Sequence, residues 1–377
     1  MRRLIALLVA LAAFVPAGAQ AALPAGDIHI GAAFSASGAG STYGGQQADA
    51  AQLAVDEVNA SGALAPARLV LDVRDSGSTP TSASAAFTQL IDAGVVALLG
   101  PTLSTSALQA DRIAQARGVP VVGVSDTADG VLDIGDNIFR VALSEEVVEP
   151  VTVAVSHRRL KYRRAAIVWA TPDAYSKSSH DVFARTLKRR RGVRLVADAS
   201  FASASKDGYR RALRRVAAQR PDVLFLSALA PDLIKLMNAA RAMPQLKDVP
   251  FVGGDSFNTP GLIDQAGDAA DGAISGTAWI ATESTPGNAA FVEAYRQTLG
   301  YQPDQFSAQA YTGVKLLALA IQRAGSTDRR AVRDQLARLR DVDTILGRFS
   351  FNARRAPVYK PVVQQIRAGR GFVKIGP

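Results

Sequence analysis

The stretch VVALLGPTLSTSALQADRIAQARGVPVVGVSDTA, residues 95–128, contains the repeating unit that decides the fold. An apolar run, Val95–Leu99, precedes a helical pattern over Ser104–Arg117, and a second apolar run follows at Pro120–Val124. Strands that alternate with helices in this rhythm form parallel sheets, because each helix carries the chain back across the sheet. The stretch therefore predicts a doubly wound α/β fold.

The same alternation occurs in two series. The first series contains two strands and two helices before this stretch (Ile28–Phe34, Gln46–Ala60, Arg68–Asp75, Thr81–Ala93). The second series begins again after it (Arg164–Trp169, Ser176–Lys188, Arg194–Phe201, Gly208–Gln219, Val223–Ser227, Pro231–Met243, Pro250–Gly253). Since each series is too short to be the whole protein, we interpret them as two Rossmann-like lobes.

The last third of the chain is mixed. Three helices are expected at Asn288–Leu299, Ser307–Ala324 and Asp328–Leu339. Gly347–Phe351 and Val358–Gln365 then have the pattern of a hairpin, which would add antiparallel edge strands.

A chain of 377 residues with 48% hydrophobic and 20% charged residues is long enough for two globular domains. We expect residues 1–21 to be a signal peptide. Residues 27–142 and 281–346 are predicted to form the first lobe, and 143–280 and 347–377 the second.

The N-terminal residues have the three parts of a secretory signal. Arg2 and Arg3 precede the apolar run Leu4–Val15, and Ala19-Gln20-Ala21 fits a cleavage site. The apolar run is too short to span a bilayer. Because the chain has no cysteine, it has neither a lipid-modified cysteine nor a thiolate metal site. We therefore expect a soluble periplasmic protein that is not lipid-anchored and is monomeric.

The formal charge of +10 is concentrated in three clusters, His157–Arg164, Arg185–Arg194 and Lys206–Arg220. Nucleic-acid binding is one interpretation of such clusters. Only two tyrosines, Tyr162 and Tyr209, lie within the clusters, too few for a series that stacks on bases, so we expect no nucleic-acid partner. Solvated helix faces explain the clusters better, with a docking surface for acidic partners as the alternative.

The usual motifs of catalysis and cofactor binding are missing from the sequence. Gly38–Gly45 follows a strand, but Tyr43 stands where a dinucleotide fingerprint needs its third glycine. The chain has no P-loop and no G-x-S-x-G elbow, and His29, His157 and His180 lack metal-type spacing. We expect no catalytic residue, no metal and no cofactor.

Open α/β sheets bind ligands beyond the carboxyl ends of their strands. Two neighbouring loops at these ends, Gly100–Ser106 and Ser125–Ala128, offer hydroxyls and backbone N–H groups near a helix start. Such groups suit a carboxylate, although serine and threonine here could also be plain N-caps.

In the second lobe, Asp255 follows the strand Pro250–Gly253 and could pair with an ammonium group, or cap a helix. Tyr43 and Tyr175 could supply aromatic walls with polar tips. Together these groups would clamp a zwitterion between the lobes.

At this point the chain resembles the leucine/isoleucine/valine-binding family, the type I periplasmic binding proteins of branched-chain amino-acid ABC importers. The stretches that carry the resemblance run from end to end (IHIGAAFSASGAGSTYGG, AAQLAVDEVNASG, LLGPTLSTSALQAD, GVPVVGVSDTAD, FSAQAYTGVKLLALAIQRAGSTDRRAVRDQLARL, LGRFSFNARRAPVYKPVVQQI). The resemblance implies two lobes joined by a three-strand hinge that close on a small amino-acid-like ligand. It implies the permease subunits of an importer as partners, and no enzymatic turnover.

The resemblance also assigns ligand-binding roles. Ser104, Ser125 and Thr127 would bind the ligand carboxylate, Asp255 the ammonium, and Tyr43 and Tyr175 would line the cleft, with Phe306 a weaker candidate.

Two positions depart from the family pattern. Asp126 replaces a small neutral residue, and Leu229 stands at a position that is aromatic in leucine-type relatives. They leave other amino acids, amides and aromatic carboxylates open as ligands. A periplasmic sensor with the same fold is the alternative function, and a hydrolase is a more remote one.

Overall fold

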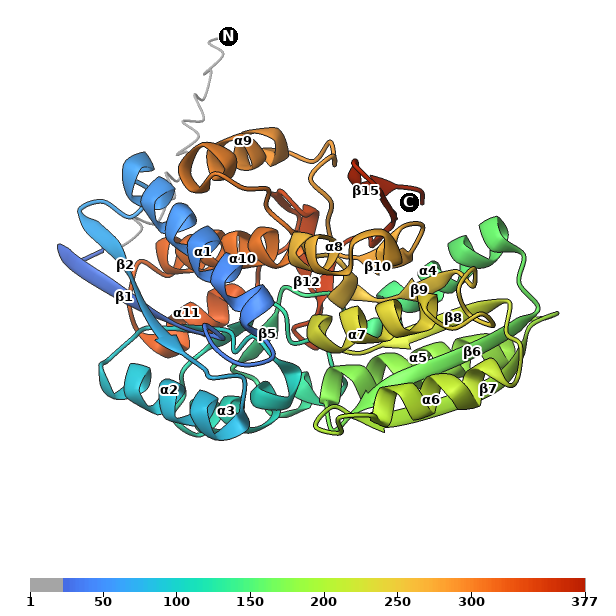
Figure 1. The fold of residues 1–377 in the computed structure, drawn as a ribbon. Helices are drawn as coiled ribbons and strands as arrows, with labels where there is room; N and C mark the ends of the chain where they lie inside the picture. The colour runs from blue at the N-terminus through green and yellow to red at the C-terminus, as the bar shows by residue number, and fades with distance from the viewer. Residues whose placement is uncertain (1–22, 377) are drawn as a thin grey trace, which may run out of the picture.

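The structure is a computed structural model that describes residues 23–376 (Figure 1). The predicted signal peptide, residues 1–21, lies outside the described residues. The chain forms two α/β lobes, one blue, cyan and orange in Figure 1 and the other green and yellow. Within residues 23–376, none of the helices combines the length and the apolar character that crossing a membrane requires.

The first lobe contains a five-stranded sheet in the order β2-β1-β3-β4-β5, and all its strand pairs are parallel. Its strands are β1 (Gly26–Phe34), β2 (Ala67–Asp75), β3 (Leu98–Leu99), β4 (Val121–Gly123) and β5 (Ile138–Arg140). Its helices are α1 (Ser41–Ser61), α2 (Pro80–Asp92), α3 (Ser104–Ala116), α9 (Asn288–Leu299), α10 (Gln305–Ala324) and α11 (Arg329–Leu336).

Helices cover both faces of this sheet because the strand residues alternate between two cores. On β1, Ile28 and Ile30 belong to the core beneath α1 and α10, whereas Ala33 belongs to the core beneath α2 and α3. The facing residues of α1 are small, and Ala50 and Ala54 are fully buried. This lets α10 pack closely against α1. A capping box of Asp304 and Ser307 begins α10.

The second lobe contains a seven-stranded sheet in the order β15-β14-β10-β9-β8-β6-β7. Its parallel strands are β6 (Arg164–Thr171), β7 (Arg194–Ala202), β8 (Val223–Ser227), β9 (Phe251–Gly253) and β10 (Ile274–Thr277). Two antiparallel strands, β14 (Val362–Arg367) and β15 (Gly371–Lys374), extend it at one edge. Its helices are α4 (Glu145–Leu160), α5 (Ala174–Arg189), α6 (Gly208–Ala217), α7 (Ala230–Arg241) and α8 (Pro260–Ala266).

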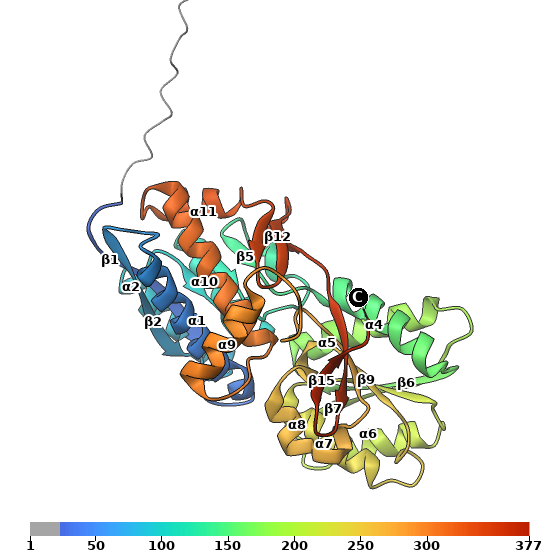
Figure 2. The same ribbon diagram turned by 90° about the horizontal axis from the view of Figure 1, so that it is seen from above.

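Three segments connect the lobes, between β5 and α4, between β10 and α9, and between β13 (Pro357–Val358) and β14. Figure 2 shows the lobes side by side with these segments between them. The predicted fold class, two doubly wound lobes joined by a three-strand hinge, is confirmed.

One boundary and one pairing differ from the prediction. A small sheet, β11 (Val342–Thr344), β12 (Gly347–Phe351) and β13, packs on the first lobe, where Phe351 contacts Phe139 at 5.2 Å between ring centroids. The chain therefore passes to the second lobe after Val358 and not at residue 347. Because this small sheet belongs to the first lobe, β12 pairs with β13. The segment Val362–Arg367, which was predicted to pair with β12, joins the sheet of the second lobe instead.

Helix α4 was not predicted from the sequence. It contains Pro150, and its buried face mixes the polar residues Glu149 and Thr152 with Val148 and Val153, whereas Val147 is exposed. A helix whose buried face carries polar residues and whose exposed face carries apolar ones has little amphipathic signal.

Candidate ligand-binding site

The carboxyl ends of the strands in both lobes meet at one cavity. It is lined by residues from both lobes, five of them predicted ligand-binding residues (Tyr43, Ser104, Ser125, Tyr175, Asp255, with Thr102, Leu103, Leu229, Ser256 and Phe306). Its volume is about 20 Å³, close to the space of a single ordered water. The lobes therefore stand close together around this site.

The loop after β3 brings the start of α3 to the cavity. Gly100 turns the chain with a φ of 90°, and a Cβ there would lie 2.6 Å from the carbonyl oxygen of Ala33, so the position requires glycine. Ser104 is the first residue of α3, and its side chain does not cap the helix. Its hydroxyl instead accepts hydrogen bonds from the N–H groups of Thr127 (3.0 Å) and Ala128 (3.2 Å).

The first N–H groups of α3 remain available to a ligand. Among the described residues, no hydrogen bond uses the backbone N–H of Ser104 or Thr105, while those of Ser106 and Ala107 bond to the carbonyl of Leu103. Free N–H groups and the helix dipole together favour an anion at this end. The lobe-one side of the cavity is therefore suited to a carboxylate.

The other two predicted carboxylate-binding residues are already hydrogen-bonded. The Ser125 hydroxyl accepts from Nε2 of Gln47 (2.6 Å) and donates to the carbonyl of Thr102 (2.7 Å). Thr127 is not among the lining residues of the cavity, and its hydroxyl donates to the carboxyl of Glu145 in the second lobe. Thr127 thus contributes to contact between the lobes in this conformation.

On the opposite wall, Asp255 directly follows Gly254 at the end of β9. It is not the N-cap of a helix, because it is the first residue of a short 3-10 helix, Asp255–Phe257, whose N-cap is Gly254. It is 6% exposed, and its Oδ1 atom has no hydrogen-bond partner in the described structure. Burial, followed by the charge of Glu145, raises its pKa well above the usual value for aspartate, whereas Arg140 opposes this. A buried carboxyl of this kind gains from a cationic partner.

Tyr175 stands beside Asp255 and is held by the same loop. Its hydroxyl lies 3.0 Å from Oγ of Ser256 and accepts from the Ser256 N–H at 3.3 Å. From the first lobe, Tyr43 packs on Phe306 with ring centroids 4.5 Å apart. Aromatic walls therefore come from both lobes.

Sequence reasoning missed a second buried carboxyl behind Asp255. Glu149 is 1% exposed, and neither of its oxygens has a hydrogen-bond partner among the described residues. A Cβ built on Gly254 would lie 3.2 Å from its Oε1, which places Glu149 directly behind the Asp255 loop. Burial, ahead of the charge of Glu145, raises the pKa of Glu149. The spacing of Glu145 and Glu149 by four residues was the available signal, because it puts both on one helix face.

The unusual Asp126 lies beneath the carboxylate side of the cavity. It is fully buried, and neither carboxyl oxygen has a hydrogen-bond partner in the described structure. Burial raises its pKa to about 7, against the opposing charge of Arg140. Asp111 of α3 is equally buried and unpartnered, and burial together with the charge of Asp126 raises its pKa too. Arg140 donates from Nη1 to the carbonyl of Thr127 at 2.8 Å and so holds the loop that carries Asp126.

Hydrogen bonds across the cleft hold the lobes in a closed arrangement. The Ala230 N–H donates to the Tyr43 hydroxyl at 2.7 Å. Thr105 donates to Oδ1 of Asp173 at 3.0 Å and accepts from the Ala174 N–H at 2.8 Å. These hydrogen bonds form without a bound ligand, so they stabilise the closed arrangement of the lobes by themselves.

A larger cavity of about 290 Å³ lies between the lobes on the hinge side and is lined by Asp129, Arg140, Glu145 and Arg354, among others. It contains none of the aromatic residues of the cleft cavity. The predicted ligand-binding residues that reach a cavity line the cleft cavity and not this one, so the cleft cavity is the candidate ligand site.

Comparisons with known proteins identify relatives of this chain. The Leu/Ile/Val-binding protein BraC3 of Rhizobium johnstonii is 27% identical over 354 residues, which cover 93% of each chain. A leucine-, isoleucine-, valine-, threonine- and alanine-binding protein of Pseudomonas aeruginosa is 23% identical, over 89% of this chain and 88% of its own.

Solved structures share the fold. The branched-chain amino-acid transporter substrate-binding protein LivJ of Streptococcus pneumoniae, in complex with isoleucine, has a TM-score of 0.84 at 27% identity, over 92% of this chain and 99% of its own. A solute-binding protein of R. palustris in complex with benzoate has a TM-score of 0.80 at 21% identity, over 93% and 96%, which shows the fold alone. The model of the family described as periplasmic binding protein matches residues 27–370. The resemblance seen in the sequence is thereby confirmed, and the chain belongs to the periplasmic binding protein family.

Proposed function

We propose that this protein is the solute-binding component of an ABC importer and that its ligand is an amino acid held as a zwitterion between the lobes. The observation that carries the proposal is that the two walls of one cavity offer opposite polar groups, hydrogen-bond donors on one wall and a carboxyl on the other. The free N–H groups at the start of α3 face it from the first lobe, and the unpartnered carboxyl of Asp255 faces it from the second. The named relatives, which are amino-acid-binding proteins, support the same class of ligand.

In this proposal the ligand carboxylate accepts from the N–H groups of Ser104 and Thr105. The ammonium pairs with Asp255, and Tyr43 and Tyr175 enclose the rest. Leu229 contributes an aliphatic side chain to the wall. The hydroxyl of Thr127 would have to leave Glu145 to reach the ligand.

Binding would act through the hinge. A cavity of about 20 Å³ is too small for an amino acid, so entry requires the lobes to move apart. A ligand that contacts both lobes binds the closed arrangement better than the open one and shifts the population toward it. The permease subunits of an importer would then recognise the loaded, closed form.

Calorimetry with leucine, isoleucine and their deaminated analogues tests the proposal. Truncating one partner of a buried charge pair costs about 2–5 kcal/mol. Asp255→Ala should therefore weaken leucine binding by at least about 30-fold, while 4-methylpentanoate, which is leucine without its amino group, should bind both proteins alike. Asp264→Asn, an exposed aspartate of the same lobe, is the matched control.

If Asp255→Ala binds leucine as tightly as the unaltered protein, the ammonium does not lie at Asp255 and the zwitterion model is wrong. Tight binding of benzoate together with no binding of any amino acid would identify the ligand as an aromatic carboxylate.

A further inference from the structure

Most of the charge in the three basic clusters of the sequence lies at one end of the second lobe. In parallel βα units, the amino ends of the strands and the carboxyl ends of the helices lie at the same edge of the sheet. Residues 158–164 end α4 and begin β6, residues 188–194 end α5 and begin β7, and residues 214–220 end α6. We call the exposed lysines and arginines of these three segments the basic pole.

Hydrogen bonds show that the three segments are neighbours. Arg190 Nη2 at the end of α5 lies 3.1 Å from Nδ1 of His157 at the end of α4. The N–H of Arg194 donates to the carbonyl of Arg163 at 2.7 Å, and Arg164 donates from Nη2 to the carbonyl of Gln219 at 2.6 Å. The pole is therefore one continuous surface.

The charge of this surface is largely uncompensated. The three segments contain thirteen lysines and arginines and no aspartate or glutamate, so the rest of the chain is net negative. Among the described residues, no lysine or arginine of the three segments forms a salt bridge. The nearby carboxylate of Asp222 accepts instead from the backbone N–H groups of Arg163 and Arg164, each at 2.9 Å.

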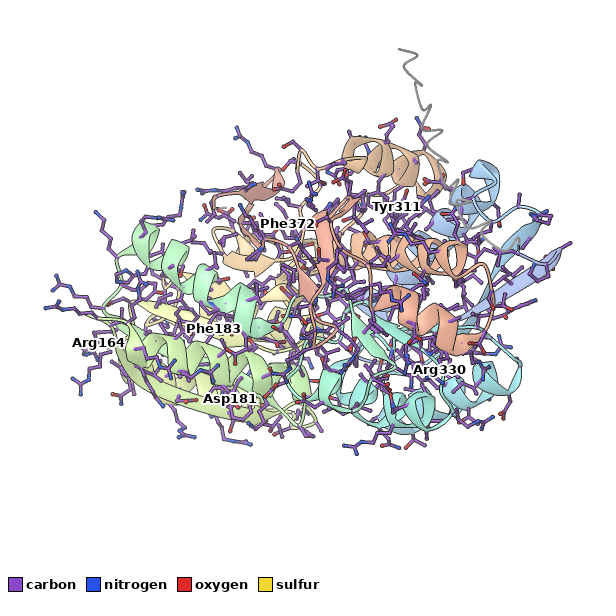
Figure 3. All side chains as sticks on the ribbon, turned by 180° about the vertical axis from the view of Figure 1, so that it is seen from behind. Arg164, Asp181, Phe183, Tyr311, Arg330 and Phe372 are labelled. Carbon is purple, nitrogen blue, oxygen red and sulfur yellow. The ribbon has the colours of Figure 1, made fainter. Side chains whose placement is uncertain are left out.

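The shape of the pole fits an extended partner. Figure 3 shows the side chains around Arg164 spreading outward from the end of the lobe, so neighbouring cations can each reach a separate anion. The one tyrosine of the segments, Tyr162, is 2% exposed and offers no ring for stacking on a base. None of the exposed large hydrophobic residues of the described chain lies in these segments, so attraction must be electrostatic.

We propose that the basic pole docks the protein on the anionic phospholipid headgroups of a bilayer. The ligand cavity lies at the carboxyl ends of the same strands, at the opposite edge of the sheet. Docking through the pole would therefore leave the cleft accessible. It would confine the protein to the membrane surface, where a permease is found, through a reversible, salt-sensitive attachment.

Sedimentation with vesicles tests this inference. Vesicles of phosphatidylcholine with phosphatidylglycerol should bind the protein at about 0.01 M salt and release it at about 1 M, because the Debye length falls from about 30 Å to about 3 Å. Vesicles of phosphatidylcholine alone should not bind it. The pole variant Lys188→Glu/Arg189→Glu/Arg191→Glu should partition at least about 100-fold more weakly, since each basic side chain at an anionic surface contributes roughly fivefold.

The matched control is Arg68→Glu/Arg330→Glu/Arg338→Glu, three exposed arginines of the first lobe with the same change in net charge. It should lose far less vesicle binding than the pole variant, and both variants should have the melting temperature of the unaltered protein. Failure of the unaltered protein to bind anionic vesicles at low salt would overturn the inference, as would equal losses in both variants. Tighter binding to a short duplex DNA than to the vesicles would assign the pole to nucleic acid instead. None of these outcomes depends on which solute the cleft binds.

Discussion

Replacing Asp126 with asparagine should stabilise the folded protein at pH 8 and leave its stability at pH 4 nearly unchanged. The side chain is fully buried, and neither carboxyl oxygen has a hydrogen-bond partner among the described residues. It packs against the main chain, because a Cβ on Gly123 would lie 2.0 Å from its Oδ1. Asparagine has the same shape and no charge, so it should occupy the same space as the protonated carboxyl.

The sign of the effect follows from the raised pKa. Burial raises the pKa of Asp126 from 3.8 to about 7, so between these values the folded state binds more protons than the unfolded state. The free energy of unfolding then falls as the pH rises through this interval. A tenfold change in proton affinity is worth about 1.4 kcal/mol, which gives up to about 4 kcal/mol over the whole interval.

Urea denaturation of both proteins at pH 4, 6 and 8 measures this difference. The stability gained by Asp126→Asn should grow from near zero at pH 4 to a few kcal/mol at pH 8. Asp111→Asn should act in the same direction and should not add fully to Asp126→Asn, because the two carboxyls titrate as a pair. Asp129→Asn, an exposed aspartate of the same loop, is the control. A gain that does not change with pH, or a loss at pH 8, would refute the reasoning.

Three further changes test the closed arrangement and the second carboxyl. Thr105→Val removes the hydroxyl that bonds to Asp173 and Ala174, so small-angle scattering without ligand should show a larger radius of gyration, whereas Thr105→Ser should not. Tyr43→Phe removes the acceptor of one N–H across the cleft, at a cost of about 1 kcal/mol, and should open the lobes to a smaller extent by the same measurement. Glu149→Gln should raise the melting temperature at pH 8 more than at pH 4, since burial raises the pKa of this carboxyl; equal shifts at both pH values would contradict its assignment.

Much of the fold could be predicted because the signals are local. The run from Ser104 to Ala116 has a hydrophobic period and ends near Gly118, and its predicted start is the observed one. Strand β3 is paired over only Leu98–Leu99, although the apolar run is longer, because pairing depends on neighbours that the sequence does not show. The partner of β12 could not be deduced either, since an alternating strand fits the edge of either sheet.

For the ligand site, the position of a residue directly after a strand end was a better predictor of its place in the cavity than its residue type. Asp255, Ser104 and Ser125 follow strand ends and reach the cavity, as the topology requires. Thr127 also follows a strand end, but its hydroxyl bonds to Glu145, a residue of a helix that was not predicted. Glu149 belongs to the same helix. Contacts made between separate chain segments were thus the part that sequence reasoning missed.

The packing of α10 against α1 sets an order for folding during synthesis. The five strands of the first lobe are made first, yet the core on one face of their sheet includes residues of α10, which emerges after the parallel strands of the second lobe. The second lobe has its strands β6 to β10 in one continuous segment and can bury most of its apolar surface sooner. The lobe that begins the chain is therefore completed only after most of the second lobe has been made. A ribosome-bound or truncated chain that stops before Gln305 would expose the alanine face of α1, where a chaperone could bind it.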